Sequence, residues 1–599
     1  MLSQSPHDAA SLAALATLLA VALDLAPEVL GQLVDRVHHV RRGLVGPQGD
    51  ALQLQGRLRD LAIGNRRIAL LAELDVEQRL VGDLVADPPK TFLDVLAQLL
   101  GDLNIAAADL DAHVASLVRE KQSKDATPLD AVRQPMTTSV RGVSERAFDV
   151  VVIGAGPPGE VCAGRLGEAG LDVAIIENHL FGGECSYYAC MPSKALLRPE
   201  ELLDEAKRVP GVSQAVSGEL DVPAALARRD EVIHDLDDTG QLPWLEERCL
   251  EVIRGSGKLD GEKRVVVGDG VLSAKKAVVV ATGSAAAMPP IDGLAEAKPW
   301  NNRDATTAKQ APESMVILGG GPVGTEMAQA WSSFGTKVVL LQGGDRLLPR
   351  DEPFAGEMVA DSLREHGVDV RTGARAESVR REGATVVVGL AGGDTVQGDE
   401  FLVAVGRKPR SDGIGLESVG VEPGERGFLE VDDQLRVGGS DWLYAIGDVN
   451  GRALLTHMGK YQARITSDHI LGKDVAATEE RRGSPHVTFT DPQVAAVGQT
   501  LEQAKGAGIN ARAVDVPIDS AAGASFVGHG TPGTSRLVVD EDRQVLVGAT
   551  FVGFETAEFL QAATIAIVGE VPLEKLWHAV PAYPTRSEVW LHLLEEYRL

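Results

Sequence analysis

Residues 182–194 read Gly182-Gly183-Glu184-Cys185-Ser186-Tyr187-Tyr188-Ala189-Cys190-Met191-Pro192-Ser193-Lys194. Proline is favoured in the first turn of a helix, because its missing N–H would have no partner there, so Pro192 predicts a helix that begins near Cys190. The positive end of that helix would stabilise a thiolate at Cys190 and lower its pKa. Cys185 lies far enough back along the expected loop to form a disulfide with Cys190. By spacing alone, the pair could equally be a structural disulfide or two unrelated buried thiols.

The residues around the two cysteines resemble the redox-active segment of the flavin disulfide reductases, the family of dihydrolipoamide dehydrogenase, glutathione reductase and mercuric reductase. The usual form of that segment is GG-x-C-x4-C-x-P-S-K, and this chain matches it at every specified position. The resemblance implies FAD, a nicotinamide cofactor and a redox disulfide in which Cys190 contacts the flavin while Cys185 faces the acceptor. It also implies flavin contacts from Gly183 and Lys194.

Composition narrows the class of protein. The chain has 599 residues, enough for several domains, and 58 Lys and Arg against 86 Asp and Glu, a net charge of −28. Such an excess of acid argues against binding to nucleic acid. Four cysteines are too few for a disulfide-stapled secreted protein, and no apolar run of about 20 residues occurs. We therefore expect a cytoplasmic protein that binds neither nucleic acid nor a membrane.

The N-terminal part has a composition of its own. Residues 1–121 are rich in Ala, Leu, Val and Asp, with apolar residues at helical spacing, and predict an all-α bundle. The polar stretch 122–147 contains Pro128 and Pro135 and predicts a linker. The bundle carries no motif that assigns a function. A docking or oligomerisation module that recruits a protein partner and a ligand-binding domain both remain open.

A dinucleotide-binding fingerprint follows the linker. Residues 149–153, an aspartate followed by four apolar residues, predict a buried strand, and three glycines come after it: Gly154, Gly156 and Gly159. Such glycines allow a tight turn and a close approach of a pyrophosphate to a helix N-terminus. Glu177 ends the next expected strand, 23 residues after Gly154, where a carboxylate binds ribose hydroxyls. Because the redox cysteines follow directly, the resemblance assigns this fingerprint to FAD.

Further residues of the expected FAD domain, 148–300 and 407–483, enter through the resemblance alone. Thr282 and Gly283 end a strand that would return against the FAD, and Asp448 would bond the ribityl chain. A helix that begins at Thr456 and His457 would direct its N-terminus toward the flavin pyrimidine. Gly406 begins another turn like those of the family.

A second fingerprint predicts the nicotinamide domain, 301–406. Its glycines are Gly319, Gly321 and Gly324, and the residue 23 positions after the first is Gln342. A carboxylate there selects NAD, whereas Gln342 neither binds the hydroxyls strongly nor repels a 2′-phosphate, and Arg346 lies near enough in sequence to attract one. The choice between NAD and NADP stays open, with a slight preference for NADP. Glu326 matches the family glutamate that pairs with the lysine beside the flavin, here Lys194; otherwise it is an ordinary first-turn glutamate.

Residues 484–599 resemble the dimerisation domain of the family, and imply a homodimer whose active sites are shared between subunits. The last segment matches the family stretch H-P-T-x-S-E with one departure, because Tyr583 stands where the proton-handling histidine belongs. Glu588, which would orient that histidine, is retained. His578 is five residues out of register, and we interpret it as a structural or surface residue.

The resemblance implies two doubly wound α/β nucleotide-binding domains and an α+β dimerisation domain, preceded by the all-α region. It implies an enzyme that passes electrons from NAD(P)H through FAD and the Cys185–Cys190 disulfide to a small-molecule acceptor. A quinone or another acceptor that is not a disulfide is an alternative, because of Tyr583. A flavin-bound scaffold or NAD(P)H sensor is an alternative of another class. No metal site is expected, and the lack of an N-terminal CxxC argues against mercuric reductase.

Overall fold

The computed structural model describes residues 145–248 and 250–598. The helical bundle expected over 1–121, and nearly all of the linker expected over 122–147, lie outside the described residues. Strand β1 (Arg146–Ile153) begins within the predicted linker, and its first two residues, Arg146 and Ala147, pair with β6. The predicted end of the linker at Ala147 is therefore wrong, because Ala147 is already part of a sheet.

The first sheet carries the first Gly-rich turn. Its strands lie in the order β3-β2-β1-β6-β5-β4, and β16 also pairs with β6. Adjacent strands pair in parallel within the group β3, β2, β1, β6 and β16. Strands β5 and β4 extend the sheet beyond β6 through antiparallel pairs. Besides β1, the bounds are β2 Val173–Glu177, β3 Leu250–Arg254, β4 Gly257–Leu259, β5 Arg264–Val267, β6 Gly270–Val280 and β16 Leu443–Ala445.

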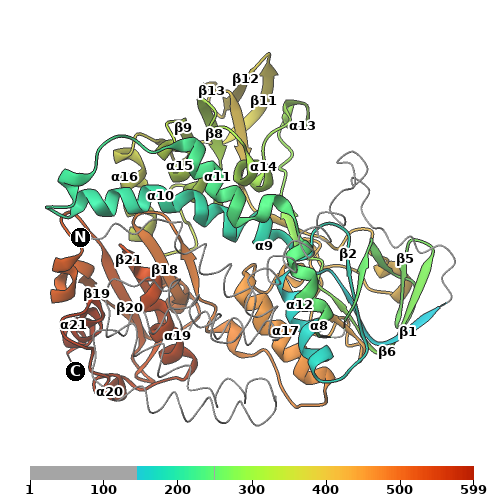
Figure 1. Ribbon diagram of the computed structural model, residues 1–599. Helices are drawn as coiled ribbons and strands as arrows, with labels where there is room; N and C mark the ends of the chain where they lie inside the picture. Colours follow the sequence, from blue (N-terminus) through green and yellow to red (C-terminus); the bar gives the residue numbers. More distant parts are fainter. Residues whose placement is uncertain (1–144, 249, 599) are drawn as a thin grey trace, which may run out of the picture. The chain divides into compact units, whose positions relative to one another are not determined.

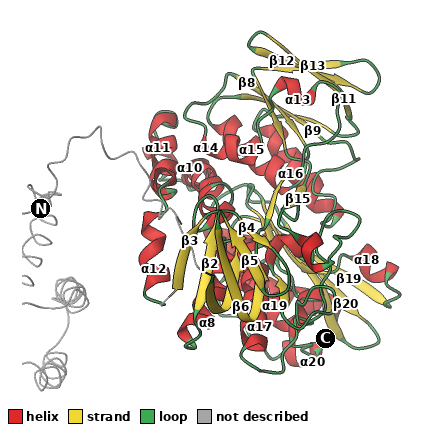
Figure 2. Cartoon of the chain, turned by 90° about the vertical axis from the view of Figure 1, so that its right-hand side faces the viewer, coloured by secondary structure: helices red, strands yellow, loops and turns green. Residues whose placement is uncertain are grey.

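Both faces of this sheet are buried, which explains why its central strands are continuous apolar runs. Val150 and Val152 of β1 belong to a core with helices α8 (Pro157–Glu168) and α17 (Thr456–Ile470). Val151 and Ile153 point to the opposite face, into a core with β4, β5 and the segment that leads to β16. Figure 2 shows α8 and α17 next to this twisted sheet.

A second parallel sheet, in the order β10-β9-β8-β14, repeats the arrangement around the second Gly-rich turn. An antiparallel sheet β11-β12-β13 and a two-stranded sheet β15-β7 accompany it. The bounds are β7 Ser284–Ala286, β8 Ser314–Leu318, β9 Lys337–Leu341, β10 Asp369–Arg371, β11 Ala376–Glu382, β12 Thr385–Leu390, β13 Thr395–Gly398, β14 Glu400–Val403 and β15 Arg407–Pro409.

The last domain is an antiparallel sheet, in the order β17-β18-β21-β20-β19, with a core that α19 and α21 cover. Its strands are β17 His486–Thr488, β18 Gln493–Gly498, β19 Ala511–Pro517, β20 Thr534–Asp540 and β21 Val545–Gly553, and its helices are α18 Leu501–Gly506, α19 Leu560–Val568, α20 Leu573–Leu576 and α21 Val589–Tyr597. The expected α/β and α+β architecture is thus confirmed for the described residues.

Helices between these sheets carry the redox segment. Figure 1 shows α10 (Cys190–Arg208) lying alongside α11 (Val222–Val232) and α15 (Pro322–Ser333), which begins at the second Gly-rich turn. The other helices are α9 Gly183–Tyr187, α12 Leu242–Glu246, α13 Leu294–Ala297, α14 Asn302–Thr307 and α16 Pro353–Glu365. Among the described residues, no helix combines the length and apolarity that a membrane crossing needs.

Candidate active site

The first Gly-rich turn requires glycine for steric reasons. Gly154 has φ +105°, and a Cβ there would meet the carbonyl oxygen of Ala281 at 2.4 Å. A Cβ on Gly159 would meet the carbonyl oxygen of Gly154 at 2.0 Å, because α8 starts so close to β1. Gly156 is the N-cap of α8, and a Cβ there would meet nothing within 4 Å. The turn is therefore tight inside and open above the helix N-terminus, where a phosphate would bind.

The second Gly-rich turn has the same construction. Gly319 has φ +115°, Gly321 is the N-cap of α15, and a Cβ on Gly324 would meet the carbonyl oxygen of Gly319 at 1.8 Å. The two ribose-reading positions also correspond. The amide of Ala155 donates to Glu177 Oε2 at 2.8 Å, and the amide of Gly320 donates to Gln342 Oε1 at 3.0 Å. Gln342 thus occupies the predicted position, with its amide oxygen in place of a carboxylate oxygen.

A cavity of about 530 Å³ opens above the first turn, within the roughly 300–1,000 Å³ that is usual for small-molecule sites. It is built from segments far apart in the chain. Residues predicted to bind FAD supply much of its lining: Gly154, Gly156, Glu177, Gly183, Thr282, Gly283, Asp448 and Thr456. The open glycine turn, the helix N-terminus and these convergent polar groups fit FAD.

One cysteine of the redox pair, Cys185, lines this cavity. Cys185 is in the short helix α9, not in an open loop as expected, and Cys190 is the first residue of α10, as predicted. Their sulfur atoms are 2.6 Å apart, so a small displacement would join or separate them. The hydrogen bond from the Cys185 thiol lowers the pKa of Cys190, aided by the Thr456 hydroxyl and the charge of Lys194, and it outweighs the opposing effect of burial. The same hydrogen bond, followed by burial, raises the pKa of Cys185.

Lys194 forms the predicted ion pair with Glu326. Its Nζ lies 2.8 and 3.0 Å from the two carboxylate oxygens, and 4.5 Å from the centre of the Phe489 ring. The carboxylate also accepts a hydrogen bond of 3.0 Å from the amide of Phe489. Helices α10 and α15 and the start of the last domain are therefore joined by one buried carboxylate.

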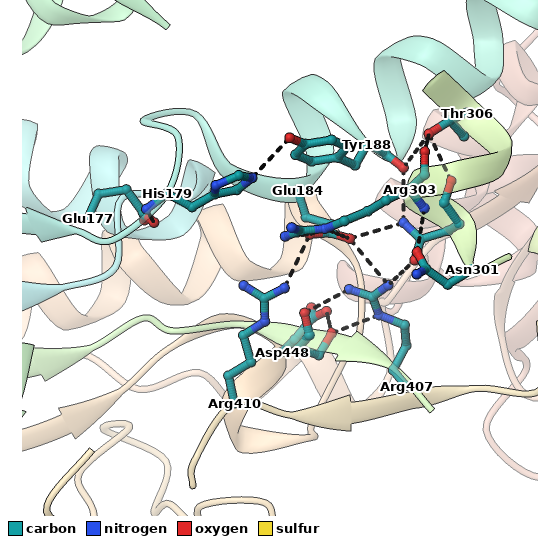
Figure 3. Close-up of polar contacts among 12 residues, drawn as sticks. Glu177, His179, Glu184, Tyr188, Asn301, Arg303, Thr306, Arg407, Arg410 and Asp448 are labelled. Carbon is teal, nitrogen blue, oxygen red and sulfur yellow. Dashed lines mark hydrogen bonds and ion pairs between the residues drawn. The ribbon is translucent and has the colours of Figure 1, made fainter. Parts of the chain in front are cut away.

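An arginine cluster around Glu184 was not predicted (Figure 3). Arg303 donates to the carboxylate from Nε at 3.0 Å and Nη2 at 2.6 Å, and guanidinium nitrogens of Arg410 and Arg407 lie 3.5 and 3.9 Å from it. Burial opposes ionisation of Glu184, but the hydrogen bonds from Arg303 and Asn302 outweigh it and lower the pKa. The three arginines line the cavity and suit a pyrophosphate. Their grouping has no local sequence signal.

Asp448 follows strand β16 and is linked to the arginine cluster through Ser284. Its carboxylate accepts a hydrogen bond from the Ser284 hydroxyl, and Ser284 in turn accepts one from Arg407 Nε at 2.9 Å. Burial raises the pKa of Asp448, against the opposing effects of Ser284 and Arg407. The carboxylate is thus fixed at the cavity wall, as a ribityl-binding group requires.

Other predicted residues lie elsewhere. Five residues predicted to contact FAD or to line its site are not among the residues that line the cavity in the part of the chain that the structure describes: Gly159, Cys190, Lys194, Gly406 and His457. The exposed His457 ring is hydrogen-bonded through Nε2 to the carbonyl oxygen of Pro485 at 2.7 Å. Of these two residues at the start of α17, Thr456 is the one that lines the cavity. The Arg346 guanidinium donates to the carbonyls of Pro349 and Asp351, at 3.1 and 3.4 Å, and its contact with a 2′-phosphate stays a prediction.

Among the described residues, neither Tyr583 nor Glu588 is hydrogen-bonded to the redox pair. The Tyr583 side chain is exposed, at 77%. Glu588 ends a short 3-10 helix (Arg586–Glu588), and its buried Oε2 has no hydrogen-bond partner among the described residues.

Comparisons with known proteins agree with this geometry. Residues 148–463 match the family model "Pyridine nucleotide-disulphide oxidoreductase", and residues 484–594 match the dimerisation domain of that family. Dihydrolipoyl dehydrogenase of Bacillus subtilis is 31% identical, over 75% of this chain and 96% of its own length. Mercuric reductase of Staphylococcus aureus is 30% identical, over 77% of this chain and 84% of its own.

Solved structures give the same assignment. LpdA of Mycobacterium tuberculosis superposes with a TM-score of 0.67 at 26% identity, covering 76% of this chain and all of its own. The HOCl-induced flavoprotein disulfide reductase RclA of Escherichia coli, as a Cu(II) complex, also gives 0.67 at 26% identity, over 75% of this chain and 99% of its own. This chain therefore belongs to the pyridine nucleotide-disulphide oxidoreductases, enzymes that use FAD and NAD(P)H.

Proposed function

We propose that this chain passes two electrons from NAD(P)H to a small acceptor through the Cys185–Cys190 pair, and that the acceptor is not a disulfide. The observation that carries the first part is the pair itself: two sulfurs 2.6 Å apart, with Cys190 at the N-terminus of α10. Lys194, one turn further along α10, is held by Glu326 and adds positive charge near the pair.

FAD, when bound in the cavity, supplies the two-electron carrier between the nicotinamide and the sulfurs. The protein determines where the proton of the reduced pair resides. Because the hydrogen bond between the two sulfurs lowers the pKa of Cys190 and raises that of Cys185, we expect Cys190 to hold the thiolate and Cys185 to keep the proton. When the Sγ–Sγ bond forms again, two electrons and the Cys185 proton leave for the acceptor.

Tyr583 supports the choice of acceptor. Reduction of a disulfide acceptor requires Cys185 to lose its proton before it attacks, and the leaving thiolate to gain one. A histidine with a pKa near 6.5 can carry that proton at neutral pH, whereas a tyrosine with a pKa near 10 cannot. Loss of general-base help costs about 10²–10⁴-fold in rate. We therefore expect slow turnover with lipoamide or glutathione disulfide and faster turnover with quinones.

A homodimer is part of the same proposal. The match to a dimerisation domain supports it, and so do apolar side chains exposed on that domain: Phe526 at 70%, Val580 at 83% and Tyr583 at 77%. We expect Tyr583 and Glu588 of the partner subunit to complete each active site. Light scattering of the full chain should give twice the chain mass of 63.2 kDa.

The test compares acceptors in Tyr583→His and Tyr583→Phe. Tyr583→His should raise kcat/KM for lipoamide at least tenfold, because Glu588 remains to orient the ring. Tyr583→Phe keeps the ring without adding a base, and should leave disulfide turnover unchanged. Quinone turnover should change little in either variant. A wild-type enzyme that reduces lipoamide as fast as quinones would contradict the proposed acceptor class.

A further inference from the structure

Three potential metal ligands converge away from the redox pair. Glu200 and Asp204 lie one turn apart on the same face of α10. His366 is the C-cap residue of α16. One ligand atom from each residue lies within 4.8 Å of the other two. Figure 1 shows α16 beside the C-terminal half of α10, so the cluster spans two helices that are far apart in the sequence.

The His366 ring directs its second nitrogen, Nε2, into the cluster. Its Nδ1 lies 2.8 Å from the carbonyl oxygen of Ser362, which can only accept a hydrogen bond, so Nδ1 carries a proton. Nε2 lies 3.4 Å from Asp204 Oδ2, and the hydrogen bond with this carboxylate raises the pKa of His366 to about 9, so a metal ion would replace a proton at Nε2. A histidine fixed through its other nitrogen to a backbone carbonyl is the usual arrangement of a metal-ligating imidazole.

Glu200 gives an independent indication. The residue is only 7% exposed, and its buried Oε2 has no hydrogen-bond partner within residues 145–248 and 250–598. A buried carboxylate without a partner is costly unless a cation or a hydrogen bond satisfies it. Lys207 pairs with Asp204 at 3.3 Å, but its side chain is 55% exposed. The cations that face the two carboxylates, Lys207 and a protonated His366, are thus both partly exposed, at 55% and 39%.

We propose that Glu200, Asp204 and His366 bind one divalent transition-metal cation, with Zn²⁺ the favoured ion. One imidazole and two carboxylates form a donor set that suits Zn²⁺, and three protein ligands leave a coordination position for water. The ion would fix α10, which begins at Cys190, to α16, which connects β9 to β10 of the second parallel sheet. No sequence motif predicts this site, because two of its ligands lie on one helix and the third lies more than 160 residues away in the sequence.

Binding is measured by equilibrium dialysis of the FAD-loaded, oxidised full-length protein against buffered Zn²⁺, with metal determined by mass spectrometry. Oxidation keeps Cys185 and Cys190 joined, so their thiols do not compete for the ion. We expect one Zn²⁺ per wild-type chain. Glu200→Gln and His366→Gln should weaken binding by at least about tenfold. The matched control Glu365→Gln removes an exposed charge next to His366 and should bind as the wild type does.

A rescue variant and a stability readout separate loss of ligands from loss of folding. His366→Asp restores an oxygen ligand and should bind Zn²⁺ more tightly than His366→Gln. Added Zn²⁺ should raise the melting temperature of the wild type and of Glu365→Gln, and not that of Glu200→Gln, with equal FAD content in all proteins. The proposal is overturned if the wild type takes up no Zn²⁺, or if Glu200→Gln and His366→Gln bind it as tightly as the control. In that case a protonated His366 serves as the cation of this cluster.

Discussion

The Lys194–Glu326 pair allows a quantitative test of how the active site is held together. The single variants Lys194→Met and Glu326→Gln, with the double variant, form a double-mutant cycle. Lys194→Met leaves a carboxylate that is 6% exposed with one remaining donor, the amide of Phe489. The double variant removes both charges, so it should be less destabilised than the two single variants added together.

The expected coupling energy follows from burial. Removing one member of a fully buried pair costs about 3–5 kcal/mol, whereas exposed pairs contribute about 0.2–1 kcal/mol. Glu326 is buried, but the Lys194 side chain is 36% exposed, which screens the interaction. We therefore expect a coupling energy on the order of 1–3 kcal/mol.

The assay is urea unfolding followed by flavin fluorescence, and the cycle is evaluated only if all four proteins have the same m value. Lys505→Met, which removes an exposed lysine from α18, is the control, and should change stability by less than about 0.5 kcal/mol. A coupling energy below about 0.5 kcal/mol would refute the reasoning, because the pair would then be no stronger than a surface pair.

Three further predictions concern the cofactors and the thiolate. Gln342→Glu should shift kcat/KM toward NADH, because a carboxylate there binds the ribose hydroxyls and repels a 2′-phosphate; an unchanged NADH/NADPH ratio would mean that position 342 does not read the ribose. Gly183→Ala should lower the FAD content of the purified protein, because its Cβ would meet the first Gly-rich turn at 2.6 Å, whereas Gly170→Ala, with φ +85° but open space around it, should retain FAD. Thr456→Ala removes a hydrogen bond that lowers the pKa of Cys190, so the thiolate absorption band should appear at higher pH than in the wild type; a band that titrates at the same pH would exclude that role.

Features set by local sterics could be predicted from the sequence. The positive φ of Gly154 and Gly319 belongs to a turn that a side chain would block, so the Gly-x-Gly-x-x-Gly pattern identifies both nucleotide-binding turns. The helix start at Cys190 was predicted from Pro192 because the restriction on proline acts within one turn. The Lys194–Glu326 pair could be predicted only from the family resemblance, since no local sequence rule predicts a contact between α10 and α15.

Features made by distant segments could not be predicted. Arg303 forms an ion pair with Glu184 because α14 packs near the redox segment. The residues around Arg303 in the sequence do not predict that contact. The start of α17 does face the cavity through Thr456, whereas the partner of the His457 side chain, the Pro485 carbonyl, could not be predicted from the local pattern. Helix positions follow from local patterns, whereas side-chain partners depend on the packing of the whole domain.

Anaerobic titration of the oxidised, FAD-loaded protein with NADPH or NADH tests the role of the Cys185–Cys190 pair most directly. The pair and FAD together hold four electrons, so the wild type should take up two equivalents. The first equivalent should produce a long-wavelength band between the Cys190 thiolate and the flavin. Cys190→Ser should keep FAD but lose this band, and should be fully reduced by one equivalent. Complete bleaching of the wild-type flavin after one equivalent, without the band, would contradict electron transfer through the pair and would favour a flavin-bound scaffold or sensor.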